Sequence, residues 1–353
     1  MISAQISRSF TYLFQRNASF LREPQFFRPL AQYSFSSAAK KDSRVSESIK
    51  LYLKEIGLSD AELENAFKHE PRLPSVDLEK SIKPKIKTFD DFGFSNSEIA
   101  VIISRAPKIL FYSLKDRVIP SMCFLKDLLG SSHDDMFKVL KRFGWFLTID
   151  LKKHIWPNIE HLHKYGVPME HILRHFRSFP RSLCINNATL MRRIDKLEAL
   201  GMNDAHSKMY IHAFRVVGGM SNEVWERKLQ AFRDLGFTET EISAIFKTAP
   251  VVFSTSPEKL RKTMAVLLST KKYGNAAVVS CAAIFSRSIE KRLKPRVEIL
   301  KILEKMNLIE KWPSLGVVAI YSSKRFHDTF VAPHISQLQE AFPVKSKRWI
   351  TNY

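Results

Sequence analysis

Apolar residues recur at the three- and four-residue spacing of a one-faced helix in several short segments of this chain. A side chain on every third and fourth residue faces the same side of an α-helix. No alternation of apolar and polar positions competes with this pattern, so the sequence predicts an all-α protein with very little β-structure. The clearest four segments are Leu63, Ala66 and Phe67; Ile99, Ile102 and Ile103; Met136, Val139 and Leu140; and Ile242, Ile245 and Phe246.

Glycines divide the chain at nearly constant intervals of 35 to 38 residues. A fixed period in this range is typical of stacked helical repeats, because one repeat cannot bury its own apolar face. The interval predicts a superhelical solenoid of about seven helical repeats, each of about 36 residues. The glycines of this ladder are Gly57, Gly93, Gly130, Gly166, Gly201, Gly236 and Gly274.

Each repeat also carries signals for a capped helix. A capping residue stands two positions after the glycine, and an acid in capping-box position follows three residues later. The predicted caps are Ser59, Ser95, Ser132, Asn203 and Thr238, and the acids are Glu62, Glu98, Asp135 and Glu241. The ladder glycine itself suits a left-handed cap at the end of the preceding helix.

Prolines mark two further points of the repeat. A helix stopper stands about twelve residues after the cap, at Pro71, Pro107, Gly144, Pro180 and Pro250. A second proline follows at Pro84, Pro120 and Pro157, and we expect it to open a second helix, since proline is tolerated in the first helical turn. Each repeat is therefore predicted to hold two helices with a bent connection.

The first residues differ in composition from the rest of the chain. Four arginines, one acid and frequent serines indicate an organelle-targeting leader, and we predict a disordered transit peptide over residues 1–35. Removal near Tyr33 would leave a net charge of +18, so most of the total of +21 belongs to the folded part. We assign residues 36–340 to the helical repeat domain and 341–353 to a basic tail.

The positive surplus, 56 Lys and Arg against 35 Asp and Glu, indicates an acidic partner such as nucleic acid. A solvated cationic surface is the plain alternative. No apolar run approaches the length of a membrane helix, about 18 residues. The three cysteines form no CxxC pair, and reduced thiols are expected.

The repeat pattern resembles the mitochondrial transcription termination factor family, in its plant form. The resemblance rests on the recurring G-[FL]-S-x-x-E-I-x-x-I-x-x-x-P pattern, on the segment from Ser288 to Leu300, and on the segment from Phe326 to Pro333. Gly144 and Arg215 stand where proline is expected, and the cap after Gly274 is blurred. The resemblance implies a left-handed superhelix of three-helix repeats, a positive groove for duplex DNA, and a role in organelle gene expression.

Cations recur two or three residues before the stopper of each repeat, and in a solenoid they would form a ladder that suits a phosphate backbone. The competing explanation is that cations favour the C-terminal end of a helix dipole. The predicted contacts are Lys68, Arg105, Lys141, Arg142, Arg177 and Lys247, with His69 and His212 at equivalent places. Lys108 and Arg181 are weaker candidates.

A second basic cluster consists of Lys291, Arg292, Lys294 and Arg296. Four cations within six residues favour nucleic-acid contact or a solvated face equally. The tail adds Lys345, Lys347 and Arg348 beside Trp349, either as a contact arm or without a role.

Signatures of catalysis and metal binding are lacking in the sequence. His161, His163, His171 and His175 cluster, but without HExxH or CxxC, and Gly218-Gly219 lacks the lysine of a phosphate loop. We therefore predict no enzyme, no metal and no cofactor.

The sequence thus predicts a monomeric nucleic-acid-binding regulator of organelle gene expression, without membrane insertion or a small-molecule substrate. DNA and RNA both remain open as the ligand, as do transcription termination or regulation and RNA processing such as intron splicing. The expected compartment is the mitochondrial matrix, with the chloroplast as the alternative. A helical-repeat scaffold that binds proteins and no nucleic acid is the alternative function.

Overall fold

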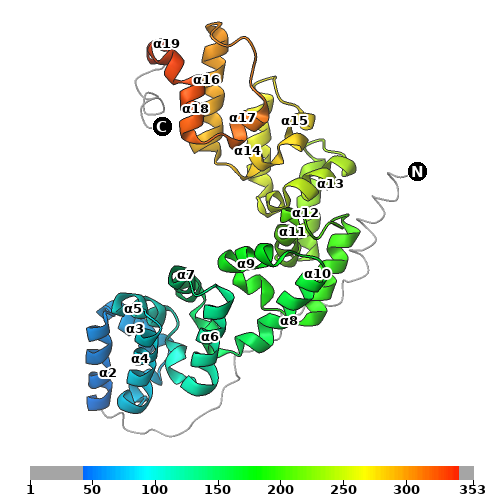
Figure 1. The fold of residues 1–353 in the computed structure, drawn as a ribbon. Coiled ribbons are helices and arrows are strands. Elements are labelled where there is room, and N and C mark those ends of the chain that lie inside the picture. The colour runs from blue at the N-terminus through cyan, green and yellow to red at the C-terminus, as the bar shows by residue number, and fades with distance from the viewer. Residues whose placement is uncertain (1–42, 342–353) are drawn as a thin grey trace. The chain divides into compact units, whose positions relative to one another are not determined.

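The computed structural model describes residues 43–341, and every regular element in that range is helical (Figure 1). The predicted all-α fold class is confirmed. The leader predicted over residues 1–35 and residues 342–353 of the predicted tail, including Lys345, Lys347 and Arg348, lie outside the described residues. Within α10 (Asn187–Ala199) the described chain divides into two compact units, residues 43–191 and 192–341.

The first unit stacks its helices in two rows. The helices α3, α5, α7 and α9 pack on one another in sequence, and α6 packs on α8. Short 3₁₀ helices join the rows and also contact one another. The α-helices of this unit are α2 (Ser43–Ile56), α3 (Asp60–His69), α4 (Lys83–Asp91), α5 (Asn96–Arg105), α6 (Ile119–Leu128), α7 (His133–Phe143), α8 (Leu151–Lys164) and α9 (Met169–Ser178). The 3₁₀ helices are η2 (Leu73–Ser75), η4 (Pro107–Phe111), η6 (Gly144–Thr148) and η7 (Pro180–Leu183), and the π-helical turns are η3 (Leu78–Ile82) and η5 (Leu114–Val118).

The second unit repeats this arrangement. Here α11 packs on α13 and α13 on α15, while α12 packs on α14. Its α-helices are α11 (Lys208–Gly218), α12 (Asn222–Arg233), α13 (Glu239–Thr248), α14 (Pro257–Leu268), α15 (Asn275–Ser280), α16 (Lys294–Lys305), α17 (Leu315–Ile320), α18 (Ser323–Phe330) and α19 (Ile335–Ala341). Shorter elements are η8 (Pro250–Ser254), η9 (Ala282–Ser286), η11 (Ala332–His334) and the π-helical turn η10 (Ile289–Leu293).

The predicted helix caps are largely confirmed. Ser59, Ser95 and Thr238 each form a complete capping box with the acid three residues on. Six of the seven ladder glycines have positive φ angles, from 68° to 115°, as left-handed helix ends require. At two of these ends the residue after the glycine packs a ring on the helix that it terminates: Phe94 on Phe89, with ring centroids 5.8 Å apart, and Phe237 on Phe232, at 5.9 Å.

Three predicted caps differ from the structure. The Ser132 hydroxyl caps α7, but Asp135 completes no capping box because its carboxylate pairs with Arg177 instead. Asn203 caps no helix, since α11 begins later, with Ser207 as its cap. Gly274 has a φ angle of −103° and precedes α15, and the left-handed residue of that repeat is Lys271, at 55°.

The stoppers and second prolines occupy defined places. Pro107, Gly144, Pro180 and Pro250 each open a 3₁₀ helix directly after the first helix of their repeat. Pro84 and Pro120 are the second residues of α4 and α6, and each follows a π-helical turn. The wider turn gives room for the proline ring, which clashes with the carbonyl four residues back in a regular helix.

Pro157 does not open its helix. The helix α8 begins at Leu151, where the Asp150 carboxylate caps the Lys153 amide, so Pro157 lies inside it. The prediction is wrong here because the cap at Asp150 precedes the proline by two turns of helix.

Buried polar side chains join consecutive repeats. The Ser121 hydroxyl of α6 donates a hydrogen bond of 2.8 Å to the Ile149 carbonyl, at the end of η6. The Asn158 amide of α8 donates bonds of 2.8 and 2.7 Å to the Leu183 and Ile185 carbonyls, which lie at the end of η7 and just after it. These bonds give hydrogen-bond donors to carbonyls at the end of the 3₁₀ helix in the next repeat. They therefore help to fix how two repeats stack.

Candidate nucleic-acid interface

In the first unit, five predicted contact residues lie on the last turns of helices that stack in sequence. They are Lys68 on α3, Arg105 on α5, Lys141 and Arg142 on α7, and Arg177 on α9. All are exposed except Lys141, which is half-buried. We call these five residues the C-terminal cation row. Its placement follows from the repeat, because the cations on α5, α7 and α9 stand two or three residues before the next 3₁₀ helix, and Lys68 stands five residues before η2.

Two members of this row contact the neighbouring helix of the stack. The Arg105 guanidinium donates a hydrogen bond of 3.2 Å to the Lys141 carbonyl, near the C-terminal end of α7. The Arg177 guanidinium lies 2.7 Å from the Asp135 carboxylate. Both contacts stabilise the stacking of helices, and the first also agrees with the helix-dipole explanation of the row.

The other members remain available to a ligand. Among residues 43–341, neither Lys68 nor Arg142 forms an ion pair, and both are exposed. The ammonium of Lys141 lies 5.5 Å from the Phe137 ring centroid, and the Arg142 guanidinium lies 5.6 Å from that of Phe143. A cation that packs on an aromatic ring keeps its charge, but its side chain can adopt fewer conformations.

In the second unit, Lys247 continues the same pattern on the last turn of α13. It is exposed, and its ammonium lies against Gly201, where an added Cβ would stand 2.8 Å from it. His212 is half-buried on α11. The second unit therefore offers one exposed cation at the predicted position, Lys247, which lies next to the glycine that follows α10.

The basic cluster at residues 291–296 does not form one surface. Lys291 is exposed, and Lys294 pairs with Glu290 at 2.6 Å. The Arg292 guanidinium donates a hydrogen bond of 3.3 Å to the Tyr321 carbonyl and is half-buried. Only part of the cluster thus faces solvent as predicted.

Arg296 is a correction to the predicted site. Its side chain is 0% exposed, donates a hydrogen bond of 2.9 Å to the Val318 carbonyl, and lies 4.5 Å from the Phe326 ring centroid. A guanidinium held in this way joins α16 to α17 and α18 and cannot reach a phosphate. The sequence could not reveal this, because a buried arginine and an exposed one look alike in a basic segment.

Two exposed lysines were missed by counting from the stopper alone. Lys80 and Lys153 stand four residues before the second prolines, Pro84 and Pro157, and both are exposed on the first turns of second helices. Lys291 holds the same position relative to Pro295, whereas Asp116 holds it relative to Pro120. The position therefore carries a lysine in three of these four repeats, which counting from the second proline would have revealed.

The weaker candidates lie at the beginnings of 3₁₀ helices. Lys108 in η4 is exposed and lies 3.4 Å from the buried carboxylate of Glu70 in the preceding repeat. Arg181 in η7 is exposed. Lys108 therefore has a structural partner between repeats.

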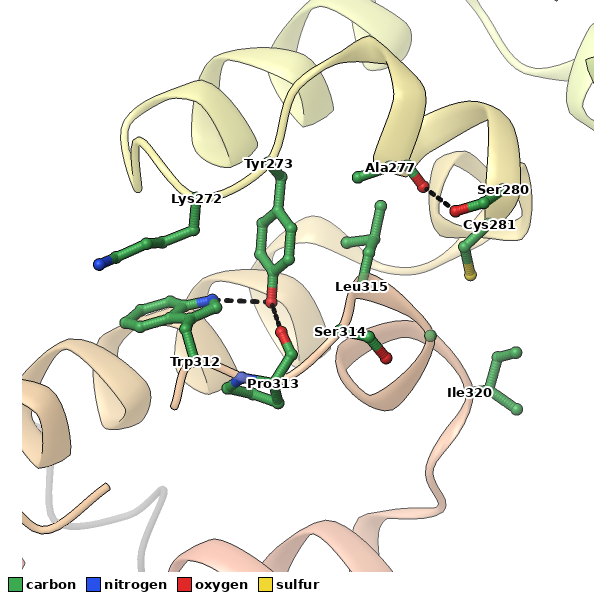
Figure 2. A pocket seen from close by; sticks show the side chains of 11 residues that line it. Lys272, Tyr273, Ala277, Ser280, Cys281, Trp312, Pro313, Ser314, Leu315 and Ile320 are labelled. Atoms are coloured by element: carbon green, nitrogen blue, oxygen red, sulfur yellow. Dashed lines mark hydrogen bonds between the residues drawn. The ribbon is translucent and has the colours of Figure 1, made fainter. Parts of the chain in front are cut away.

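A cleft of about 510 Å³ opens between the α14–α15 connection and α17 (Figure 2). The Tyr273 hydroxyl accepts a hydrogen bond of 2.7 Å from the Trp312 indole and donates one of 2.7 Å to the Pro313 carbonyl. Burial raises the pKa of Tyr273 to about 12 and also raises the pKa of the Cys281 thiol. Among the residues lining this cleft, the hydroxyl is thus engaged and the thiol stays protonated, so neither is activated as a nucleophile.

The predicted histidine cluster does not form one site, because His163 on α8 is exposed and His161 half-buried, whereas the other two are packed into the fold. His171 and His175 on α9 are buried, and the His175 ring nitrogen Nε2 lies 2.8 Å from the Ser182 hydroxyl. Within residues 43–341 no group of three His, Cys, Asp or Glu side chains is placed to hold a metal ion. None of the helices in that range is long and apolar enough to cross a bilayer.

Comparison with known proteins gives one family. The mTERF family model matches residues 30–128, 114–230 and 166–327. The chain is 20% identical over 257 residues to "Transcription termination factor MTERF8, chloroplastic" of Arabidopsis thaliana, which covers 72% of the chain and 50% of that protein. It is 23% identical over 300 residues to "Transcription termination factor MTEF18, mitochondrial" of the same plant, covering 78% and 51%. The chain therefore spans about half the length of these two relatives.

Proposed function

The chain belongs to the mTERF family, and from that premise we propose that it regulates organelle gene expression by binding nucleic acid along its repeats. The observation that carries the proposal is the C-terminal cation row on α3, α5, α7 and α9. Cations that recur once per repeat, at intervals of 35 to 37 residues in the sequence, suit a phosphate backbone, whose charges are evenly spaced. The family, whose two relatives are named transcription termination factors, supports nucleic-acid-related regulation in an organelle.

The finer assignment is duplex DNA, duplex RNA or both, bound through phosphates by a monomeric protein without a catalytic role. Transcription termination or regulation is one outcome of such binding, and RNA processing such as intron splicing is the other. The arginine-rich segment at residues 1–35 favours the mitochondrial matrix over the chloroplast.

Fluorescence anisotropy with labelled duplex DNA and duplex RNA tests the proposal. Affinity should fall steeply with salt, since each phosphate contact on B-DNA contributes about 0.9 to the slope of log K against log salt. The triple variant Lys68→Ala, Arg105→Ala, Arg142→Ala should bind more weakly to every sequence and give a shallower slope.

The matched control is Lys87→Ala, Lys126→Ala, Lys164→Ala. It removes the same net charge from exposed lysines on α4, α6 and α8. Equal losses in the two triple variants would mean that total charge, and not the row, attracts the ligand. Affinity that does not change with salt would reject nucleic-acid binding and favour the scaffold alternative.

A further inference from the structure

An apolar groove of about 510 Å³ lies on the first unit, between α6, α8 and the beginning of α9. Its walls include Cys123, Phe124 and Leu128 from α6, Trp156 from α8, and Met169 and Leu173 from α9. Four of these side chains, Phe124, Trp156, Met169 and Leu173, are only half-buried. The groove thus leaves apolar surface in contact with water, which a partner would remove from it.

Comparison of the repeats shows that the groove is a local departure from the pattern. Cys123 and Phe124 stand three and four residues after Pro120. The same two positions hold Lys87 and Thr88 after Pro84, Glu160 and His161 after Pro157, and Glu298 and the buried Ile299 after Pro295. Among these four repeats, only the one at Pro120 has apolar residues at both positions. Phe124 packs edge to face on Trp156 of α8, with ring centroids 6.4 Å apart, and both rings stay half-buried at the groove.

The shape of the groove suits a helix. Two helices that pack side by side, as α6 and α8 do, leave a furrow into which the side chains of a third helix fit. In the second unit, the short helix α19 packs on α16 and buries Leu338 completely, so a short helix with one apolar side can dock on a helix of this fold. The neighbours of Leu338 in α19, Ser336 and Gln339, are exposed, so α19 is amphipathic.

The rim of the groove carries one charge of each sign. Asp127 on α6 and Lys152 on α8 both line it, both are exposed, and neither forms an ion pair within residues 43–341. The carboxylate of Asp127 disfavours a phosphate backbone at this place. Opposite charges on the two walls instead match a ligand with one basic and one acidic side chain beside its apolar face.

We propose that this groove binds an amphipathic helix of a partner protein. The helix presents Leu, Met or Phe at positions i, i+3 or i+4, and i+7, with a base facing Asp127 and an acid facing Lys152. The lining of the groove includes no member of the C-terminal cation row, and its nearest approach to the row is on α9, where Leu173 and Arg177 lie one turn apart on the same face.

Binding of a synthetic helix to the full chain tests this proposal. Three labelled peptides of about four turns share the same apolar positions and flank them with one Lys and one Glu, with two Glu, or with two Lys. The wild-type protein should prefer the Lys–Glu peptide by about threefold, the effect of one exposed ion pair. The variant Asp127→Lys makes both walls positive and should shift the preference to the peptide with two Glu.

Asp91→Lys is the matched control, because Asp91 holds the same position on α4 as Asp127 on α6 and is also exposed. It should leave the peptide preference unchanged. Bound Lys–Glu peptide should also slow alkylation of Cys123, which is exposed, but not of the half-buried Cys184. Equal affinity for all three peptides, or no protection of Cys123, would overturn the proposal.

Two further measurements separate this site from other occupants. Sedimentation at rising protein concentration should show no self-association; a dimer that Asp127→Lys abolishes would assign the groove to a second copy and reject a partner helix. Affinity for duplex DNA should be the same in Asp127→Lys and Asp91→Lys. Peptide affinity thus tests the proposed groove, and DNA affinity tests the proposed function, so that either one can fail without the other.

Discussion

The residue that follows the second proline of a repeat is a buried polar side chain in this protein. Lys85, Ser121, Asn158 and Arg296 hold this position, and each is at most 5% exposed. Three of them donate hydrogen bonds to carbonyls of the next repeat, whereas Lys85 donates to Ser81 in its own. In three repeats this position thus performs the same task with side chains of different chemistry, which hides the pattern in the sequence.

Arg296→Ala should lower the stability of the second unit. The variant leaves the Val318 carbonyl without its donor and opens a cavity beside Phe326, which together cost about 2–4 kcal/mol. Urea unfolding followed by circular dichroism would measure the loss. Lys291→Ala, at an exposed position in the same cluster, should change the midpoint little. An equally small effect of Arg296→Ala would mean that the guanidinium is not part of the core.

The stability should also rise with pH in the alkaline range because of Lys196. Burial against Trp225, whose ring centroid lies 5.1 Å from the ammonium, lowers the pKa of Lys196 to about 8. The ordinary lysine value is about 10.4 in an unfolded chain. Between these two values the unfolded state binds a proton that the folded state has released, so stability increases with pH there and is constant below and above.

Lys196→Met should remove that contribution. The difference in unfolding free energy between wild type and variant should change between pH 8 and pH 10, by up to about 1.4 kcal/mol per pH unit. Urea titrations at a series of pH values would show it. A difference that stays constant over this range would contradict the burial of Lys196 as the cause.

At the scale of the element, the repeat is an α-helix, a 3₁₀ helix and a second α-helix, and much of it could be predicted. Caps such as Ser95 and helix-ending glycines such as Gly236 interact only with backbone groups a few residues away, so the sequence around them is enough to predict their roles. The π-helical turns before Pro84 and Pro120 could not be predicted, because they depend on how the proline ring fits an already capped helix. Burial of Arg296 depends on α18, about 30 residues away.

The left-handed helix ends give a paired prediction at this scale. Gly236→Ala places a side chain at a φ angle of 80° and should destabilise the protein by about 1 kcal/mol. Gly274→Ala is the control, because its φ angle is −103° and an added Cβ would meet no atom within 4 Å. Thermal unfolding should show a lower midpoint for the first variant and a smaller change for the second, which loses only the preference for glycine at the N-cap of α15. The opposite order would refute the assignment of Gly236 as the helix end.

At the scale of the whole molecule, the stability of each stacked repeat depends on its contacts with the repeats on either side. The hydrogen bonds of Asn158 join α8 to the end of η7 and to the residues just after it, and they are contacts between one repeat and the next. Local opening in such a structure spreads from the weakened junction and fades with distance along the stack. Disturbing this junction should therefore leave the far end of the first unit unaffected.

Asn158→Leu makes that consequence measurable. The variant leaves two carbonyls without donors, at a cost of about 2 kcal/mol or more, while the leucine retains much of the volume. Hydrogen exchange should quicken most in α8, η7 and α9, less in α6 and α7, and least in α2 and α3. Asn187→Leu, at an exposed position on α10, should leave exchange in these helices as in the wild type. Uniformly faster exchange across residues 43–191 would instead show that the first unit opens as a single block, with no separate contribution from each junction.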